Sequence, residues 1–274
     1  MPKQRPTLGL RPRTDRKSEV VSPYFWYHFG EGTGTTLADV SGSGPTLTVE
    51  GTLTNFWDNP GFGTGNGTDI HTTESGEDAH IRSVCDLQQF GASDQLLIAF
   101  DIYVTANPSS QEDLLWWGEN AAASGWGIEV NASGQFVFVI RAVDASGANN
   151  GAISGYTVDT NANARQTIVL DVQGVGDNLV DIDLYVNGTA EGTSVSSHNL
   201  AGGTGAIDAP TDNDARGLTL MARNTGASQD RWWGGRMGNA FVMHRSSIDT
   251  TLAALLGTEL FKYQSEFPLC LVGK

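Results

Sequence analysis

A period-two alternation of apolar and polar side chains is the feature of this sequence that most restricts its fold. In residues 96–104 and again in 179–186, every second side chain is large and apolar, whereas Asp101, Tyr103, Asp181, Asp183 and Tyr185 lie between them. Successive side chains of a β-strand point to opposite faces, so each segment predicts a strand with one face toward a core. The second segment ends in Asn187-Gly188, which is typical of a tight hairpin turn.

Further segments have the same character. Residues 135–141 are apolar on both faces, as in a strand between two layers, and more strands are expected at 166–172, 217–222 and 238–244. One short helix is expected at 247–256, because Ser247 can cap its first turn and Gly257 follows its last. The pattern predicts an all-β chain that folds as an antiparallel two-sheet β-sandwich with one short C-terminal helix.

The charge distribution separates an N-terminal arm from the body. Residues 1–18 hold six of the 16 basic residues and one of the 31 acidic residues, which leaves ten basic and thirty acidic residues in the remainder. Prolines at 2, 6, 12 and 23 predict an extended arm that orders only on a partner; a solvated tail is the alternative. The expected organisation is an arm at 1–23, a β-sandwich at 24–256 and a tail at 257–274.

Composition limits the partners and the cell compartment. A formal net charge of −15 and a pI near 4.5 argue against nucleic acid as a partner, and no apolar run is long enough for a membrane span. The first twenty residues lack the apolar stretch of a secretion signal, so the chain is expected to be made in the host cytoplasm and kept soluble, or to leave the cell by another route; the expected location is a virion. Cys85 and Cys270 either pair over a long range or, as favoured here, stay as two thiols.

A glycine-rich run at 30–36, GEGTGTT, raises the possibility of a phosphate-binding loop. Such a loop needs a lysine before its Ser/Thr and a helix after it, and this sequence supplies neither. The glycines are better explained as turn positions with positive φ that link the first strand to the next.

Three stretches in order resemble the laminin-G-like and concanavalin A-like jelly-roll superfamily. They are Phe29–Gly34 followed by Asp39–Gly42, then Leu184–Gly188 (LYVNG), and then Trp233–Phe241 with His244-Arg245 and the expected helix. The resemblance covers roughly residues 24–256. It implies a jelly-roll sandwich whose concave face or rim loops bind glycans, often with calcium, although fold alone does not fix function.

Catalytic and metal-binding patterns are weak. The related glucanases carry two catalytic glutamates on one strand; Asp181 and Asp183 share a face here, but both glutamates are missing and Tyr185 takes the next position on that face. No metal site is assigned. Calcium is possible, because oxygen ligands occur at Asp39, Asp58, Asp69 and in the run 208–214.

Aromatic and basic residues provide the candidate binding surface. In each of the pairs Trp116-Trp117 and Trp232-Trp233, strand geometry sends one indole inward and the other outward, where it can stack on a sugar or enter a neighbouring subunit. Core packing is the alternative. The candidate ligand- or partner-binding residues are Trp117, Trp126, Trp232, Trp233, Arg231 and Arg236; the assembly-arm residues are Lys3, Arg5, Arg11, Arg13, Arg16 and Lys17.

The sequence favours a structural or adhesive module without catalytic activity. The basic arm suits an acidic partner, including a second copy of this chain, so a homo-oligomer within a larger assembly is expected. A capsid decoration or fibre protein of a bacteriophage virion fits best. A free carbohydrate-binding lectin, with or without calcium, is the alternative, and a glycoside hydrolase is third.

Overall fold

Eighteen strands and no helix make up the part of the chain that the structure describes. The computed structural model describes residues 23–27, 29, 34–39, 41–42, 44–51, 57–58, 69–71, 80–84, 94–104, 106–119, 124–141, 149–152, 156–160, 165–174, 179–197, 217–224, 229–231 and 233–245. Within these ranges, nothing resembles a membrane-spanning helix. The predicted helix and tail, both cysteines and the predicted arm except Pro23, which begins the first strand, lie outside them.

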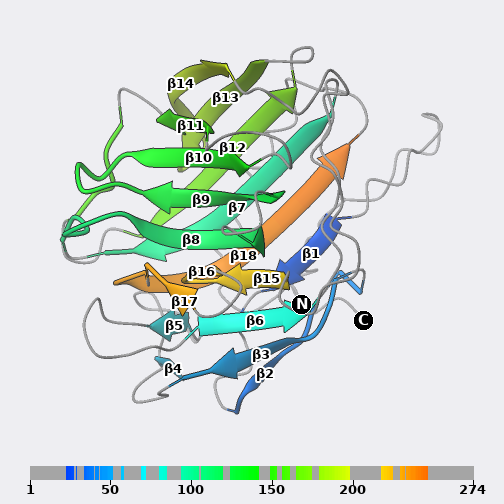
Figure 1. Ribbon diagram of the computed structural model, residues 1–274. Helices are drawn as coiled ribbons and strands as arrows, with labels where there is room; N and C mark the ends of the chain where they lie inside the picture. The colour runs from blue at the N-terminus through cyan, green and yellow to red at the C-terminus, as the bar shows by residue number, and fades with distance from the viewer. Residues whose placement is uncertain are drawn as a thin grey trace, which may run out of the picture.

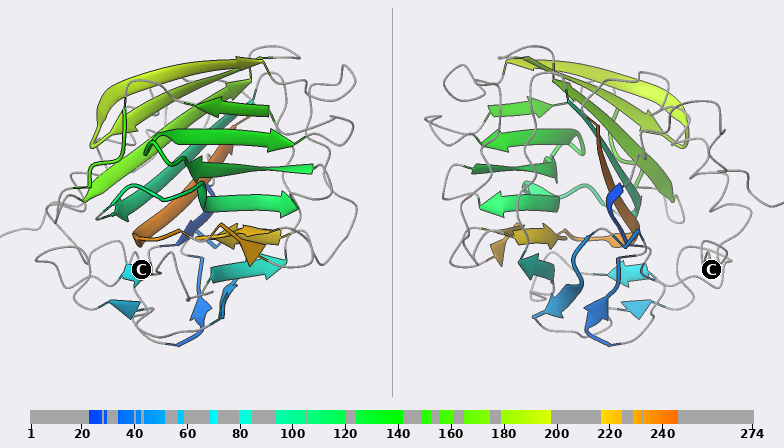
Figure 2. Two further views of the ribbon diagram at one scale, coloured as in Figure 1. Left: turned by 60° about the vertical axis from the view of Figure 1, so that its left-hand side comes forward. Right: turned by 90° about the vertical axis from the view of Figure 1, so that its right-hand side faces the viewer.

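Two eight-stranded antiparallel sheets face each other as a β-sandwich (Figures 1 and 2), which confirms the predicted fold class. The first, the β7 sheet, runs β14-β13-β12-β7-β18-β5-β4, with β1 also paired to β18. Its strands are β1 (Pro23–Tyr27), β4 (Trp57–Asp58), β5 (Asp69–His71), β7 (Gln95–Tyr103), β12 (Gln166–Gly174), β13 (Leu179–Val186), β14 (Thr189–Ser197) and β18 (Arg236–Arg245).

The second, the β8 sheet, runs β11-β10-β9-β8-β15-β6-β3-β2. Its strands are β2 (Thr36–Leu37), β3 (Leu47–Glu50), β6 (His80–Val84), β8 (Glu112–Glu119), β9 (Ser124–Val130), β10 (Phe136–Arg141), β11 (Asn149–Ala152) and β15 (Gly217–Leu220). A separate ribbon pairs β16 (Arg223–Asn224) with β17 (Gln229–Asp230).

Local signals explain these strands. The two alternating segments form β7 and β13. Every second, apolar side chain of each strand faces the core between the sheets, where Ile98, Phe100, Ile182 and Leu184 are at most 1% exposed. The hairpin prediction is also confirmed, because Asn187 and Gly188 both have positive φ between β13 and β14. Gly34 in the glycine-rich run has φ +91°, as its turn role requires.

Both outer sheet faces are buried near their centres. On the β7 sheet, Leu97, Ala99, Val169, Phe241 and Met243 form an apolar cluster that is 0–8% exposed. On the β8 sheet, a second cluster holds Trp116, Val137 and Val139, which are 0–3% exposed. The middle of neither sheet therefore offers a flat open surface, and binding groups are best sought where the strands end.

A carboxylate fixes β1 to the loop that follows β2. Asp39 accepts hydrogen bonds from the backbone N–H of Trp26 (2.6 Å) and of Gly44 (2.7 Å), and from both the backbone N–H and the hydroxyl of Ser41. The Tyr27 hydroxyl adds a bond to the Pro45 carbonyl at 2.5 Å. Burial alone would raise the pKa of Asp39, but the hydrogen bonds outweigh burial and hold this pKa below its usual value.

Replacing Asp39 should therefore weaken the fold in a pH-dependent way. Asp39→Asn is expected to lower the free energy of unfolding at pH 7 by on the order of 2 kcal/mol, because hydrogen bonds to a charged acceptor are lost. Because the folded-state pKa is depressed, this loss is present above about pH 4 and shrinks as pH falls through the folded-state pKa. Urea unfolding between pH 2 and pH 7 measures it, with exposed Glu191→Gln as the control. A pH-independent loss would contradict the assignment.

A close approach in the β8 sheet gives a second prediction. A Cβ on Gly127 would lie 2.2 Å from Cε3 of the Trp116 side chain and 2.8 Å from the Leu115 carbonyl oxygen. Gly127→Ala should cost roughly 2–3 kcal/mol through overpacking. Gly34→Ala has open space and should cost only about 1 kcal/mol from its positive φ. Equal losses in chemical unfolding would show that the Trp116 contact is not tight.

Candidate functional site

One end of the sandwich gathers polar loops from both sheets. At this end β7 stops opposite the start of β18 and of β12, with Tyr103 opposite Arg236 and Ile102 opposite Gln166. The β9–β10 turn and the β13–β14 turn lie at the same end. We call this surface the loop rim; it comprises residues 103, 106–111, 131–135, 156–160, 165, 187–188, 231 and 233–236.

Hydrogen bonds and side-chain packing hold three rim loops together. Asn131 closes its turn by accepting the backbone N–H groups of Ser133 and Gln135 on its side-chain oxygen, at 2.9 and 3.0 Å. The carbonyl of Gly134, the last residue of that turn before Gln135, accepts the Val158 N–H at 2.9 Å. The Asn107 side chain packs against Gly134. The loops after β7 and β9 and the loop before β12 are thus joined into one surface.

Tyr156 anchors the loop before β12. Its ring stacks on Phe136, with centroids 6.3 Å apart, and its hydroxyl donates to Oε1 of Gln166 at 2.5 Å. Gln166 also receives the Asp159 N–H and donates to the Asp159 carbonyl. Burial first, and then the charges of Asp159 and Glu191, raise the pKa of Tyr156 to about 12, so the phenol remains a hydrogen-bond donor at neutral pH.

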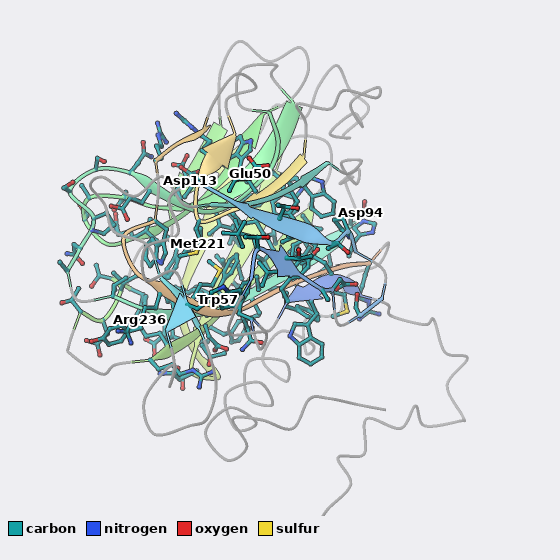
Figure 3. All side chains as sticks on the ribbon, turned by 90° about the horizontal axis from the view of Figure 1, so that it is seen from below. Glu50, Trp57, Asp94, Asp113, Met221 and Arg236 are labelled. Atoms are coloured by element: carbon teal, nitrogen blue, oxygen red, sulfur yellow. The ribbon has the colours of Figure 1, made fainter. Side chains whose placement is uncertain are left out.

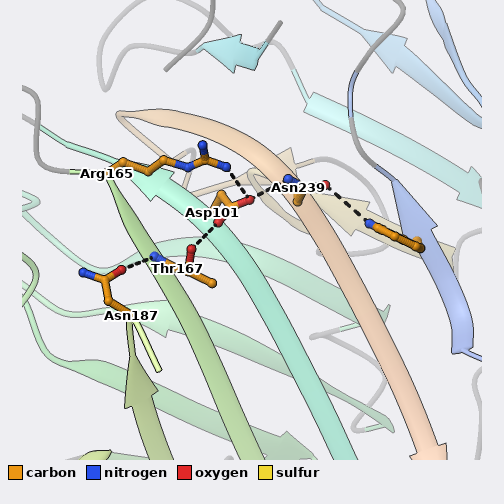
Figure 4. Close-up of polar contacts among 6 residues, drawn as sticks. Asp101, Arg165, Thr167, Asn187 and Asn239 are labelled. Carbon is orange, nitrogen blue, oxygen red and sulfur yellow. Dashed lines mark hydrogen bonds and ion pairs between the residues drawn. The ribbon is translucent and has the colours of Figure 1, made fainter. Parts of the chain in front are cut away.

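A buried carboxylate organises the β7-sheet side of the rim (Figure 4). Asp101 is 0% exposed and accepts hydrogen bonds from the Thr167 hydroxyl at 2.7 Å, the Asn239 amide at 2.5 Å and the Arg165 guanidinium at 3.0 Å. The Asn239 oxygen in turn lies 3.4 Å from the Trp26 indole nitrogen. One carboxylate thereby links β7, β12 and β18 and reaches β1 through Asn239.

Three arginines lie on the rim. Arg165 is paired to Asp101, and its side chain is 25% exposed. Arg231 has φ +52°, and its side chain is 29% exposed. Its guanidinium pairs with one carboxylate oxygen of buried Glu129 at 2.8 Å, and the Gln111 amide donates a hydrogen bond to the other oxygen. The Arg236 guanidinium lies over the Tyr103 ring, 5.4 Å from its centroid. Figure 3 shows Arg236 far from Asp94, which precedes β7 at its other end.

The structure separates the arginine candidates from the tryptophan candidates. Arg231 and Arg236 are half-buried at the rim, and their binding role stays a prediction. Trp117, Trp126 and Trp233 are 5%, 0% and 0% exposed and belong to the core between the sheets, which corrects the expectation that they face a ligand. Trp117 packs on Trp126 with centroids 5.6 Å apart. Trp232 and the six arm residues lie outside the described part of the chain.

Alternation correctly gave the two faces of the Trp116-Trp117 pair. Trp117 points into the core, and Trp116 points to the outer face of the β8 sheet. The outward indole is nevertheless fully buried there. The alternation of side chains along the strand therefore predicted to which face each indole points. It did not predict whether the outward indole is exposed to solvent, because that depends on what covers the sheet.

The calcium candidates are not assembled into a site among the described residues. Both Asp39 oxygens accept hydrogen bonds within the protein, and no group of three or more possible metal-ligating acidic, histidine or cysteine side chains occurs in the described ranges. Asp58 of β4 is the register partner of Asp69 in β5. The run 208–214 lies outside the described residues.

The acidic pair of β13 lies away from the rim. Asp183 is opposite Asp171 of β12, and Asp171 is buried and held by the Gln95 and Gln173 amides. Burial first, and then the charge of Asp181, raise the pKa of Asp183; Asp183 and Asp171 in turn add to burial in raising the pKa of Tyr185. This is a crowded acidic patch on the outer face of the β7 sheet.

Comparison with solved structures identifies proteins of similar fold. A structure of botulinum neurotoxin type C, whose cell entry depends on two ganglioside molecules, matches with a TM-score of 0.53 and 15% identity over 87% of this chain and 51% of that chain. The binding domain of neurotoxin DC, in complex with rat synaptotagmin II, matches with 0.52 and 15% over 87% and 52%. The serotype D binding domain matches with 0.51 and 11% over 89% and 51%.

This chain spans about half the length of those neurotoxin structures, and at such identities the likeness is one of fold. A scan of protein-family models and a search of curated proteins both found no match. Only the likeness to the solved structures bears on the fold, and it agrees with the β-sandwich of this chain.

Proposed function

We propose that this protein is a glycan-binding adhesive module that acts by binding rather than catalysis, with the loop rim as its binding surface. The observation that carries the proposal is the composition of the rim: asparagine, glutamine and serine side chains alternate with Tyr103 and Tyr156 and are accompanied by arginines. Sugars present hydroxyl groups around an apolar ring face, so they require this mixture of planar hydrogen-bonding groups and aromatic rings.

The fixed positions of the rim side chains support the same function. The Asn131 turn, the Tyr156–Gln166 contact and the Asp101 network hold their side chains before any ligand arrives. A surface fixed in advance loses less conformational entropy on binding, which matters for ligands that make few apolar contacts. The buried centres of both sheets add to the argument, because among the described residues they leave the strand ends as the polar surface apart from the acidic patch on β13.

The neurotoxin similarity is compatible with this proposal, because the type C toxin interacts with gangliosides, which are glycolipids. The finer family assignment, a concanavalin A-like jelly roll, belongs to the proposal as well and rests on the residue patterns at 29–42, 184–188 and 233–245. The Asp181–Asp183 pair lacks the two glutamates of the related glucanases, and Tyr185 takes the next position on that face, so the proposal assigns this pair no catalytic role.

In its full form the proposal places this module on a bacteriophage virion. Its support is the charge contrast between residues 1–18, with six basic side chains and one acidic, and a remainder with ten basic and thirty acidic residues. Such an arm suits attachment to an acidic protein surface, including another copy of the chain. The chain would then be made in the host cytoplasm and bind host glycans from the particle surface.

A glycan array tests the binding function. The protein should bind a defined subset of glycans, and Tyr103→Ala should weaken that binding roughly tenfold by removing a ring that also supports Arg236. Thr48→Ala, at an exposed position on β3, is the control and should leave binding unchanged. Binding lost on adding a chelator would favour the calcium-dependent lectin, and absence of binding to every glycan would refute the function.

Deleting residues 1–22 tests the assembly role separately. The truncated chain should still bind glycans but should no longer sediment with the native particle, because its basic anchor is gone. Sedimentation of tagged full-length and truncated chains from producing cells measures this. Equal incorporation of both chains, or sedimentation of the full-length protein only as a small free species, would contradict the virion assignment.

A further inference from the structure

A buried carboxylate holds two half-buried side chains next to each other on the β8-sheet side of the rim. Glu129 lies in β9, and its side chain is 3% exposed. Its Oε1 accepts a hydrogen bond from Nη1 of Arg231 at 2.8 Å, and its Oε2 accepts one from Nε2 of Gln111 at 2.7 Å. Because both groups bind the same carboxylate, the guanidinium and the amide are neighbours, although Gln111 and Arg231 are distant in the sequence.

Arg231 is fixed through its backbone as well as through its side chain. Its φ of +52° lies in the left-handed region, which residues other than glycine rarely adopt. Its carbonyl oxygen accepts the backbone N–H of Asp113 at 2.9 Å. A strained backbone conformation persists only where its surroundings fix it, and such residues concentrate at binding sites. The guanidinium is therefore in place before a ligand arrives.

The two side chains offer complementary hydrogen-bonding groups. A guanidinium carries five N–H donors, and Glu129 binds Arg231 through Nη1 alone. Within the described part of the chain, the Nη2 and Nε groups of Arg231 have no protein partner, and this side chain is 29% exposed. The Gln111 amide gives its nitrogen to Glu129, so its carbonyl oxygen, on the other side of the amide group, can accept. Donors and an acceptor thus lie side by side.

This combination matches hydroxyl groups better than a carboxylate. A hydroxyl both donates and accepts, so two adjacent hydroxyls of a sugar can accept from Arg231 and donate to Gln111. A carboxylate only accepts, and its oxygens would face the lone pairs of the Gln111 carbonyl. Moreover, Glu129 already balances the charge of Arg231 at 2.8 Å, so an anion gains little from this guanidinium.

We propose that Arg231 and Gln111, held by Glu129, bind two adjacent hydroxyl groups of an uncharged sugar. Arg231 supplies the donors and Gln111 the acceptor, and Glu129 is a positioning residue that does not touch the sugar. This inference rests on the proposed glycan-binding function and adds the ligand class and two contact residues.

Neutral glycans and their acidic counterparts, compared on an array and by calorimetry, test the ligand class. Lactose is compared with 3′-sialyllactose, and cellobiose with its glucuronate-terminated counterpart, among other such pairs. In each pair that binds, the neutral member should bind at least as tightly as the acidic one. Its affinity should change less than about twofold between roughly 0.05 and 0.5 M salt, because no net charge is recognised.

Two substitutions that leave Glu129 a partner test the contact residues. Arg231→Lys keeps the positive charge opposite Glu129 but loses the planar fork, and it should weaken binding of the neutral glycan about tenfold. Gln111→Ala removes the acceptor, leaves the Arg231–Glu129 pair and should weaken binding about fivefold. Arg245→Lys is the matched control, because Arg245 is a half-buried arginine at the end of β18 remote from the rim. It should leave binding unchanged, and thermal melts establish that each variant is folded.

The outcomes separate this inference from the function on which it rests. Binding of only the acidic members, or binding that is lost as salt rises, would overturn the inference and leave glycan binding intact. Equal effects of Arg231→Lys and Arg245→Lys would do the same. If no glycan on the array bound, both the inference and the proposed function would fall.

Discussion

The buried carboxylate of Asp101 is the constraint on which the rim depends. An ionised group withdrawn from water is tolerated only when charged and hydrogen-bonding partners replace its hydration. Those partners come from 64, 66 and 138 residues away in the sequence, as Arg165, Thr167 and Asn239. The network is therefore satisfied only when β12, β7 and β18 keep their register, and that register also places Tyr103 between two arginines.

The burial of both outer sheet faces limits where the proposed binding surface can lie. A β-sandwich usually has one core between its sheets, but here apolar clusters on both outer faces are buried as well. Groups at the sheet centres, Trp116 and Val169 among them, are consequently part of the stable interior. Polar side chains from the β7 and β8 sheets instead lie close together at the strand ends, where loops from both sheets are hydrogen-bonded to one another.

Much of the fold was predictable because strand and turn signals are local. The parity of Ile98 and Ile182, and the positive φ required at Asn187 and Gly188, follow from a few neighbouring residues. The candidate site was less predictable. Arg231 and Arg236 stood out as cations in an acidic body, but their partners Glu129 and Tyr103 lie more than 100 residues earlier in the chain. No local pattern indicated Asp101 or Arg165 as part of the same surface.

The sequence by itself determined the β-class, the position of the main strands, the Asn187-Gly188 hairpin and the charge contrast between arm and body, because each of these depends on adjacent residues or on composition. Only the tertiary structure decided that Trp117, Trp126 and Trp233 pack the core and that the arginines form the rim. The physical reason is that alternation assigns a side chain to one face of its strand. Whether that face is covered depends on segments distant in the chain.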